Sequence, residues 1–157
     1  MSVTIVPYLA EWSAEFYAIA RALRIALGNS ALRIDHIGST AVPGLAAKNR
    51  IDVQVSVADL SSVDAVGPRL EALGYEARPN SARDHVPANM IENGGDWEKR
   101  FFTSGARNRP TNIHVRRLGA ANQRYALLFR DYLRAHPTSA AAYGELKRGS
   151  LRSCRIF

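Results

Sequence analysis

Apolar residues recur at steps of three and four in four segments of the chain, which is the spacing of one face of an α-helix. The predicted helices cover residues 12–27, 63–73, 122–135 and 138–148. The first ends at Gly28 and the second at Gly74, residues that tolerate the left-handed end of a helix. The last two are separated by His136-Pro137, which stops a helix.

Other segments alternate apolar and polar residues, which is the pattern of a half-buried strand. The predicted strands cover residues 31–37, 51–57, 75–78, 100–103 and 111–116. The last two form an antiparallel pair around the turn at 105–110. Residues 80–98 are rich in Pro, Gly and polar side chains and predict a long surface loop.

The order of these elements predicts the fold class. Helix, strand, strand, helix, three strands and two helices indicate an α+β fold in which a mixed β-sheet carries helices packed mainly on one side. No internal repeat, low-complexity tract or linker interrupts the pattern. We therefore expect a single domain over residues 1–157.

Composition narrows the class of protein. The chain has 157 residues, of which 46% are hydrophobic, enough to enclose a core. No apolar run approaches the roughly 18–20 residues of a membrane span, so no membrane partner is expected. The single cysteine, Cys154, has no partner for an internal disulfide, which favours a reducing, cytoplasmic location.

The net charge of +7 favours anionic partners. Positive charge gathers in residues 100–117, which contain five arginines and no acidic residue, and again from Lys147 onward. The expected partners are an anionic small molecule or nucleotide, with nucleic acid as an alternative. Self-association into a homo-oligomer through an apolar face near the C-terminal helix is a further hypothesis.

The turn that follows the predicted strand 31–37 offers candidate phosphate-binding residues. Gly38 lets the backbone approach a ligand closely, and the hydroxyls of Ser39 and Thr40 can bind phosphate oxygens together with free backbone N–H groups. Lys48 and Arg50 can add charge-assisted contacts to the same anion. Such a turn is common, so the sequence around it must be considered before a binding function is assigned to it.

A resemblance to the GrpB family is carried by the blocks HIGSTAVPGL at 36–45, AK at 47–48 and IDV at 51–53. Further similarity lies in IVPY at 5–8, LEALGY at 70–75, NIHV at 112–115 and FRDYLR at 129–134. The resemblance covers almost the whole chain. It implies a nucleotidyltransferase-like fold and kinship with a domain fused to some dephospho-coenzyme A kinases, but it implies no established reaction.

The sequence departs from active nucleotidyltransferases in its carboxylates. Those enzymes hold two Mg²⁺ ions with Asp-x-Asp or Asp-x-Glu on one strand and a third acid on a later strand. Here Asp52 is the strong metal candidate, but Gln54 is neutral, and the later strand offers His114 and Arg116. The acids that could complete the set lie in the long loop: Asp84, Glu92 and Asp96. Whether the chain is an enzyme stays open, and Mg²⁺ is the cofactor that such an activity would require.

Positive and titratable side chains stand where the acids are missing. His36 and His114 are expected to flank Asp52, and a His–Asp pair is a workable general base. Arg100 and Arg116, on neighbouring predicted strands, are expected to project into the same cleft and bind the ligand.

These observations favour a protein that binds a nucleotide-like or phosphorylated small molecule at the Gly-Ser-Thr turn, without standard two-metal catalysis. Two alternatives remain. One is an active metal-dependent nucleotidyltransferase, and the other is an RNA- or DNA-binding domain that uses the basic stretch 100–117.

Overall fold

The computed structural model describes residues 3–91 and 93–153, so Glu92 and Cys154 lie outside the described residues. Its centre is a five-stranded mixed sheet with the order β2-β4-β7-β6-β5. The bounds of these strands are β2 Arg33–Ile37, β4 Ile51–Val57, β5 Tyr75–Ala77, β6 Arg100–Ser104 and β7 Thr111–Arg117. β4 and β7 are parallel, and the other neighbouring pairs are antiparallel.

One face of the sheet carries the main hydrophobic core. The alternate residues of β4 that begin at Ile51 point to helices α1 (Glu11–Leu27) and α2 (Val63–Ala72) and are fully buried. Trp12 and Leu23 of α1 and Leu70 of α2 meet them there. Burial of large apolar side chains supplies the main driving force for folding, so this face holds the sheet together.

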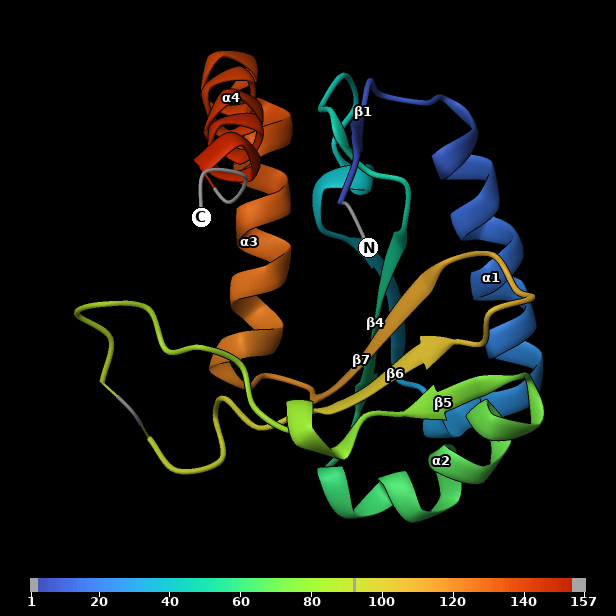
Figure 1. The fold of residues 1–157 in the computed structure, drawn as a ribbon. Coiled ribbons are helices and arrows are strands. Elements are labelled where there is room, and N and C mark those ends of the chain that lie inside the picture. The colour runs from blue at the N-terminus through green and yellow to red at the C-terminus, as the bar shows by residue number, and fades with distance from the viewer. Residues whose placement is uncertain (1–2, 92, 154–157) are drawn as a thin grey trace.

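The opposite face is polar and is only partly covered. Helix α3 (Ala121–Ala135) lies over its far end, where the Gln123 side chain donates to Ser56 and the Gln123 carbonyl accepts from Gln54. Helix α4 (Pro137–Ser153) packs on α3. Figure 1 shows α3 and α4 on one side of the sheet and α1 and α2 on the other. The mixed α+β fold is therefore confirmed, and helices lie beside both faces of its sheet.

A second, smaller core joins α3 and α4 to the turn after β2. Its buried members are Val42, Leu45, Leu133 and Ala140. Because this cluster connects the turn to the last two helices, residues near the end of the chain are placed beside residues 38–48. The two-residue strands β1 (Ile5–Val6) and β3 (Ala47–Lys48) pair nearby and were not predicted.

The predicted loop after β5 folds back on the protein. The backbone N–H of Asp84 donates to the Trp97 carbonyl at 2.8 Å, and Trp97 itself is 2% exposed. This return places the Asp84 side chain over the polar face of the sheet. Within the described residues, no helix combines the length and apolar character required to cross a bilayer.

Candidate functional site

The turn after β2 approaches the sheet so closely that it requires glycine. Gly38 has a φ of +72°, and a Cβ atom at this position would lie 2.9 Å from Oδ2 of Asp52. Ser39 to Ala41 then form a single helical turn. Only glycine combines this backbone conformation with this contact, so the turn and Asp52 form one unit.

Four of the predicted phosphate-binding residues line one cavity of about 190 Å³, which we call the cationic cavity. Its wall consists of Ser39, Thr40, Ala47, Lys48, Arg50, Asp52, Asn112 and Lys147. Three of these side chains are cationic and one is acidic. The cavity therefore attracts an anion.

Lys147 is the cation of this cavity that the sequence did not identify as a site residue; the neutral Asn112 and Ala47 were not identified either. Its Nζ donates to Oγ of Ser39 at 2.6 Å, although 108 positions separate the two residues in the chain. Burial and the nearby charge of Lys48 lower the pKa of Lys147. The excess of positive charge from Lys147 onward was the only signal in the sequence, and that signal did not locate the residue.

Asp52 forms the boundary of the cationic cavity and is held by two side chains of β7. Nδ2 of Asn112 donates to Oδ1 of Asp52 at 2.9 Å, and Nε2 of His114 lies 3.4 Å from the same oxygen. Burial alone would raise the pKa of Asp52, but the contacts with His114 and Asn112 and the charge of Arg50 bring this pKa below its ordinary value. Asp52 is therefore ionised at neutral pH.

His114 lies between this carboxylate and two cations. Its Nδ1 is 3.5 Å from Nζ of Lys99 and 3.4 Å from a guanidinium nitrogen of Arg116. Burial lowers the pKa of His114, and the charge of Arg116 acts in the same direction. The neutral ring fits all its neighbours when Nε2 carries the proton toward Asp52 and Nδ1 accepts. In this arrangement the His114 ring contacts the Asp52 carboxylate and helps to hold it in place.

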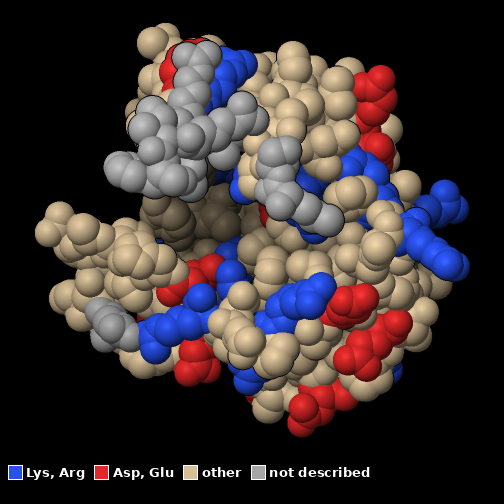
Figure 2. Space-filling model, viewed as in Figure 1, with Lys and Arg blue, Asp and Glu red and all other residues tan. Residues whose placement is uncertain are grey.

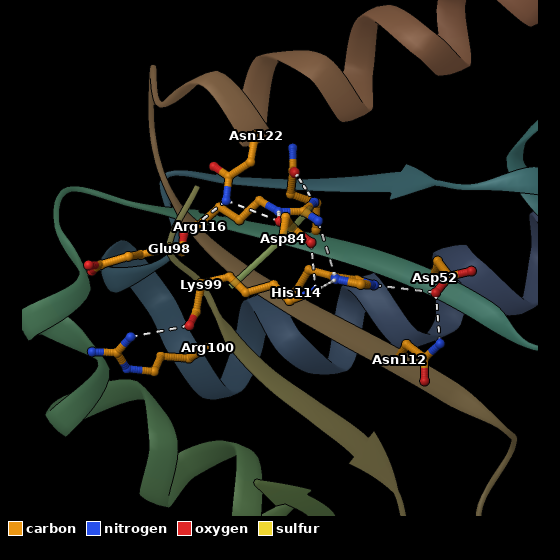
Figure 3. Close-up of polar contacts among 10 residues, drawn as sticks. Asp52, Asp84, Glu98, Lys99, Arg100, Asn112, His114, Arg116 and Asn122 are labelled. Carbon is orange, nitrogen blue, oxygen red and sulfur yellow. Dashed lines mark hydrogen bonds and ion pairs between the residues drawn. The ribbon is translucent and has the colours of Figure 1, made fainter. Parts of the chain in front are cut away.

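A second acid, Asp84, reaches the site from the loop but is paired with cations. Oδ2 of Asp84 accepts from Nε of Arg116 at 2.8 Å, and Oδ1 accepts from Nζ of Lys99 at 2.6 Å. Burial alone would raise the pKa of Asp84, but the contacts with Arg116 and Lys99 outweigh it and lower this pKa to about 2. Figure 3 shows the line of contacts from Asp52 through His114 to Arg116 and Asp84.

The neutral Gln54 completes this network. Its Oε1 accepts from Nη1 of Arg116 at 2.7 Å, and both side chains are buried. Among the described residues, no three His, Cys, Asp or Glu side chains group closely enough to hold a metal ion. Arg116 lies in the site, as expected, but its guanidinium is engaged by protein groups. Of the other loop acids, Asp96 pairs with Arg117 at 2.7 Å.

A second cavity, of about 360 Å³, adjoins the first at Asp52, and we call it the aromatic cavity. Its wall consists of Ile37, Gly38, Asp52, Asp84, His85, Trp97, His114, Arg116, Asn122, Tyr125, Ala126 and Phe129. Figure 2 shows a hollow on this side of the molecule with both acidic and basic side chains around it. The two cavities together offer a charged compartment and a largely apolar one.

His36 does not flank Asp52, and this expectation was wrong. In the pairing of β2 with β4, His36 lies opposite Val53, so its side chain points to the core face of the sheet. There it stacks on Phe16 with ring centroids 4.6 Å apart, and its Nε2 lies 2.9 Å from Oγ1 of Thr40. Burial and the charge of Arg134 lower the pKa of His36 to about 4. His36 therefore supports the turn from beneath, and the Thr40 hydroxyl is engaged by it.

Arg100 does not enter the cleft either. Its register partner on β7 is Val115, a core residue. Because paired residues point to the same face, Arg100 projects from the core face of the sheet, away from Asp52. It lines a separate cavity beside α2 and donates to the Lys99 carbonyl at 3.2 Å. Figure 3 shows it pointing away from Asp52.

Three other arginines of residues 100–117 also point to different parts of the molecule. Arg109 pairs with Glu15 of α1, whereas Arg117 pairs with Asp96 and Arg116 is buried. Three of the five arginines in residues 100–117 are thus paired with acids: Arg109 with Glu15, Arg116 with Asp84 and Arg117 with Asp96.

Comparison with known proteins identifies relatives along nearly the whole chain. The sequence model of the GrpB protein family matches residues 2–155. A UPF0157 protein of Halalkalibacterium halodurans is 34% identical over 94% of this chain and 68% of its own length. A dephospho-CoA kinase of Mycolicibacterium paratuberculosis is 40% identical over 94% of this chain, but the match spans only 39% of the kinase.

Solved structures of two other proteins have a similar fold. The crystal structure of the conserved protein GrpB from Enterococcus faecalis is similar with a TM-score of 0.77 and 30% identity, over 98% of this chain and 86% of that one. A cytoplasmic RNA terminal U-transferase is similar with a TM-score of 0.50 and 14% identity, over 82% of this chain and 35% of that one. The second likeness shows a nucleotidyltransferase-like fold and nothing about activity.

Proposed function

This chain belongs to the GrpB family, and we propose that it binds a nucleotide-like or phosphorylated small molecule in the cationic cavity, without a pair of divalent metal ions. The ligand's phosphate would lie among the Ser39 hydroxyl, Lys48, Arg50 and Lys147, with the remainder in the aromatic cavity. Any reaction at this site would then depend on these side chains, which position the anion, and not on a pair of metal ions.

The observation that carries this proposal is the meeting of Lys147 with the Gly-Ser-Thr turn. Lys147 reaches Ser39 from α4, and Lys48 and Arg50 line the same cavity from the segment before β4. Burial lowers the pKa of Lys147, and the like charge of Lys48 lowers it further. A bound phosphate would relieve the repulsion between these like charges through charge-assisted hydrogen bonds.

The charges around Asp84 argue against two-metal catalysis. A Mg²⁺ ion requires several oxygen ligands in near-octahedral geometry. Both oxygens of Asp84 already accept from cationic side chains, and Gln54 supplies a neutral amide that Arg116 occupies. A metal ion between Asp52 and Asp84 would have to displace these cations. The arrangement therefore favours direct neutralisation of the ligand by the protein.

The experiment is a thermal-unfolding screen against nucleotides and inorganic phosphate, each with EDTA and with Mg²⁺. Coenzyme A precursors belong in the screen, because the chain matches part of proteins named dephospho-CoA kinases. A ligand at a hundred times its dissociation constant stabilises by about 2.7 kcal/mol, which raises Tm by roughly 5–10 °C for a domain of this size. We expect this shift in EDTA as well as in Mg²⁺.

The double substitution Ser39→Ala with Arg50→Ala should abolish the shift. Arg33→Ala is the matched control for loss of an arginine, because Arg33 is half exposed, pairs with Asp35 on the edge strand β2 and does not line the cationic cavity. A shift that requires Mg²⁺ and triphosphates would support the nucleotidyltransferase alternative and overturn our proposal. Salt-sensitive binding of RNA or DNA, without any small-molecule response, would support the nucleic-acid alternative.

A further inference from the structure

The charge of the cationic cavity matches one particular form of phosphate. Lys48, Arg50 and Lys147 line it together with a single carboxylate, Asp52, which leaves an excess of two positive charges. A phosphate monoester carries a charge close to −2 at neutral pH, whereas a diester carries −1. The cavity is thus neutralised by one monoester and only half neutralised by one diester.

Aromatic rings form an apolar wall of the aromatic cavity, beside the expected position of the remainder of the ligand. The rings of Tyr125 and Phe129 on α3 are 6.1 Å apart and within 7° of parallel. Trp97 borders the same wall at an angle, with its ring centroid 6.2 Å from that of Tyr125 and the two ring planes tilted by 59°. Planar aromatic rings stack favourably on such a surface, and the contact tolerates many ring types.

Two polar atoms of residues in this cavity wall have no hydrogen-bond partner among the described residues. They are Nε1 of Trp97, which is a donor, and Oδ1 of Asn122, which is an acceptor. Each residue is 2% exposed. An unpaired buried polar group destabilises a protein, and because both residues line the aromatic cavity, a ligand with polar atoms on its edge is favoured there. A heteroaromatic ring with acceptor and donor atoms on its edge offers that partner.

Asp52 sets the distance between the two compartments. It lines both cavities, and Gly38, which lies against its carboxylate, lines the aromatic cavity. A ligand that occupies both must therefore place its linker beside Asp52 and the His114 ring. A hydroxylated linker is suited to this position, because Asp52 accepts hydrogen bonds.

We propose that the ligand is a heteroaromatic phosphate monoester whose dianionic phosphate binds in the cationic cavity and whose ring lies against Tyr125 in the aromatic cavity. This inference rests on the proposed function and specifies the ligand class for the same site. Nucleoside monophosphates have this chemistry. Triphosphates exceed the positive charge of the cavity, and phosphodiesters do not match it.

Isothermal titration of the full chain in EDTA tests the inference with four probes. They are adenosine 5′-monophosphate, its 3′,5′-cyclic diester, ribose 5-phosphate and adenosine, and a second set contains the uridine compounds. We expect the monoester nucleotide of the preferred base to bind at least about tenfold more tightly than ribose 5-phosphate, which lacks the ring. It should also bind more tightly than its cyclic diester, which carries one charge fewer. The free nucleoside should bind most weakly.

Two variants separate the two compartments. Tyr125→Ala should weaken binding of the nucleoside monophosphate roughly tenfold and leave ribose 5-phosphate unchanged, because only the ring contact is lost. Lys147→Ala should weaken both probes by a similar factor. Trp97→Phe keeps an aromatic ring but removes the donor, and should weaken the monophosphate roughly fivefold. Urea unfolding of each variant establishes that it remains folded.

The outcomes distinguish this inference from the proposed function. Equal affinity for ribose 5-phosphate and the nucleoside monophosphates would overturn the ring assignment while leaving the phosphate site intact. Equal affinity for the cyclic diester would overturn the dianion assignment. An unchanged affinity in Trp97→Phe would show that the Trp97 donor does not meet the ligand. Failure of every phosphate probe to bind would overturn the proposed function itself.

Discussion

The Nη1 atom of Arg116 lies 2.7 Å from Oε1 of Gln54, and the two side chains join β7 to β4 on the polar face of the sheet. The same guanidinium donates through Nε to Asp84. A cation therefore occupies the part of the sheet where a nucleotidyltransferase would gather carboxylates. Because a cation stands in place of carboxylates, the site is less negative. We therefore expect it to bind an anion without a metal ion between the anion and the protein.

Asp52→Asn distinguishes the two views of the site most directly. The substitution removes the one negative charge of the cationic cavity, so a phosphate ligand should bind several-fold more tightly. About 1 kcal/mol, the interaction of two charges roughly 4 Å apart in water, corresponds to roughly fivefold. Titration with inorganic phosphate or a nucleoside monophosphate in EDTA measures the change. Weaker binding, together with lost sensitivity to Mg²⁺, would instead assign Asp52 to a metal.

Asp84→Asn should destabilise the protein by about 2–4 kcal/mol, because it leaves two cations at a largely buried site without their carboxylate. The side chains of Arg116 and Lys99 are only 7% and 10% exposed. Asp131→Asn is the matched control, since Asp131 is 56% exposed and its pair with Arg130 should contribute less than about 1 kcal/mol. Urea denaturation measures both, and equal effects would contradict the role given to Asp84.

Gly38→Ala should cost about 2–4 kcal/mol and also weaken phosphate binding. The backbone has a positive φ, which an alanine adopts at a cost, and the added Cβ would contact Asp52. Gly119→Ala separates the two effects, because Gly119 has a φ of +82° with open space around it. Unfolding in urea should show the larger loss for Gly38→Ala. Similar losses would mean that the contact with Asp52 is unimportant.

His36 should make the protein sensitive to mild acid. Its pKa is about 4 in the folded chain and about 6.5 when unfolded, so the unfolded chain binds more protons between these values. Stability should therefore fall as the pH decreases from about 6.5 to about 4, by up to about 1.4 kcal/mol per pH unit.

The substitution His36→Gln removes this titration. Urea unfolding at several pH values should show a flatter profile for His36→Gln than for the natural sequence over that window. His85→Gln serves as the matched histidine control, because His85 is exposed in the loop after β5. Parallel profiles for the natural chain and His36→Gln would contradict burial of a neutral His36.

The periodicity of the sequence was sufficient to predict most helices and strands, and to predict which face of a strand two polar side chains share. Alternation in 51–57 predicted that Asp52 and Gln54 share a face, and the spacing of apolar residues located α1, α2 and α3. The turn motif and the cations after it also predicted Ser39, Lys48 and Arg50 as binding residues, and these three line the cationic cavity. These are local properties, which depend on the chain's own repeat.

Three features were decided by tertiary structure alone. Alternation does not state which face of the sheet a strand's odd residues occupy, because a shift of one residue in register exchanges the two faces. The pairing of Ile37 with Asp52 turned His36 to the core, and the pairing of Arg100 with Val115 turned that arginine away. Lys147 meets Ser39 only because α4 packs on α3, a contact between distant parts of the chain that no local pattern encodes.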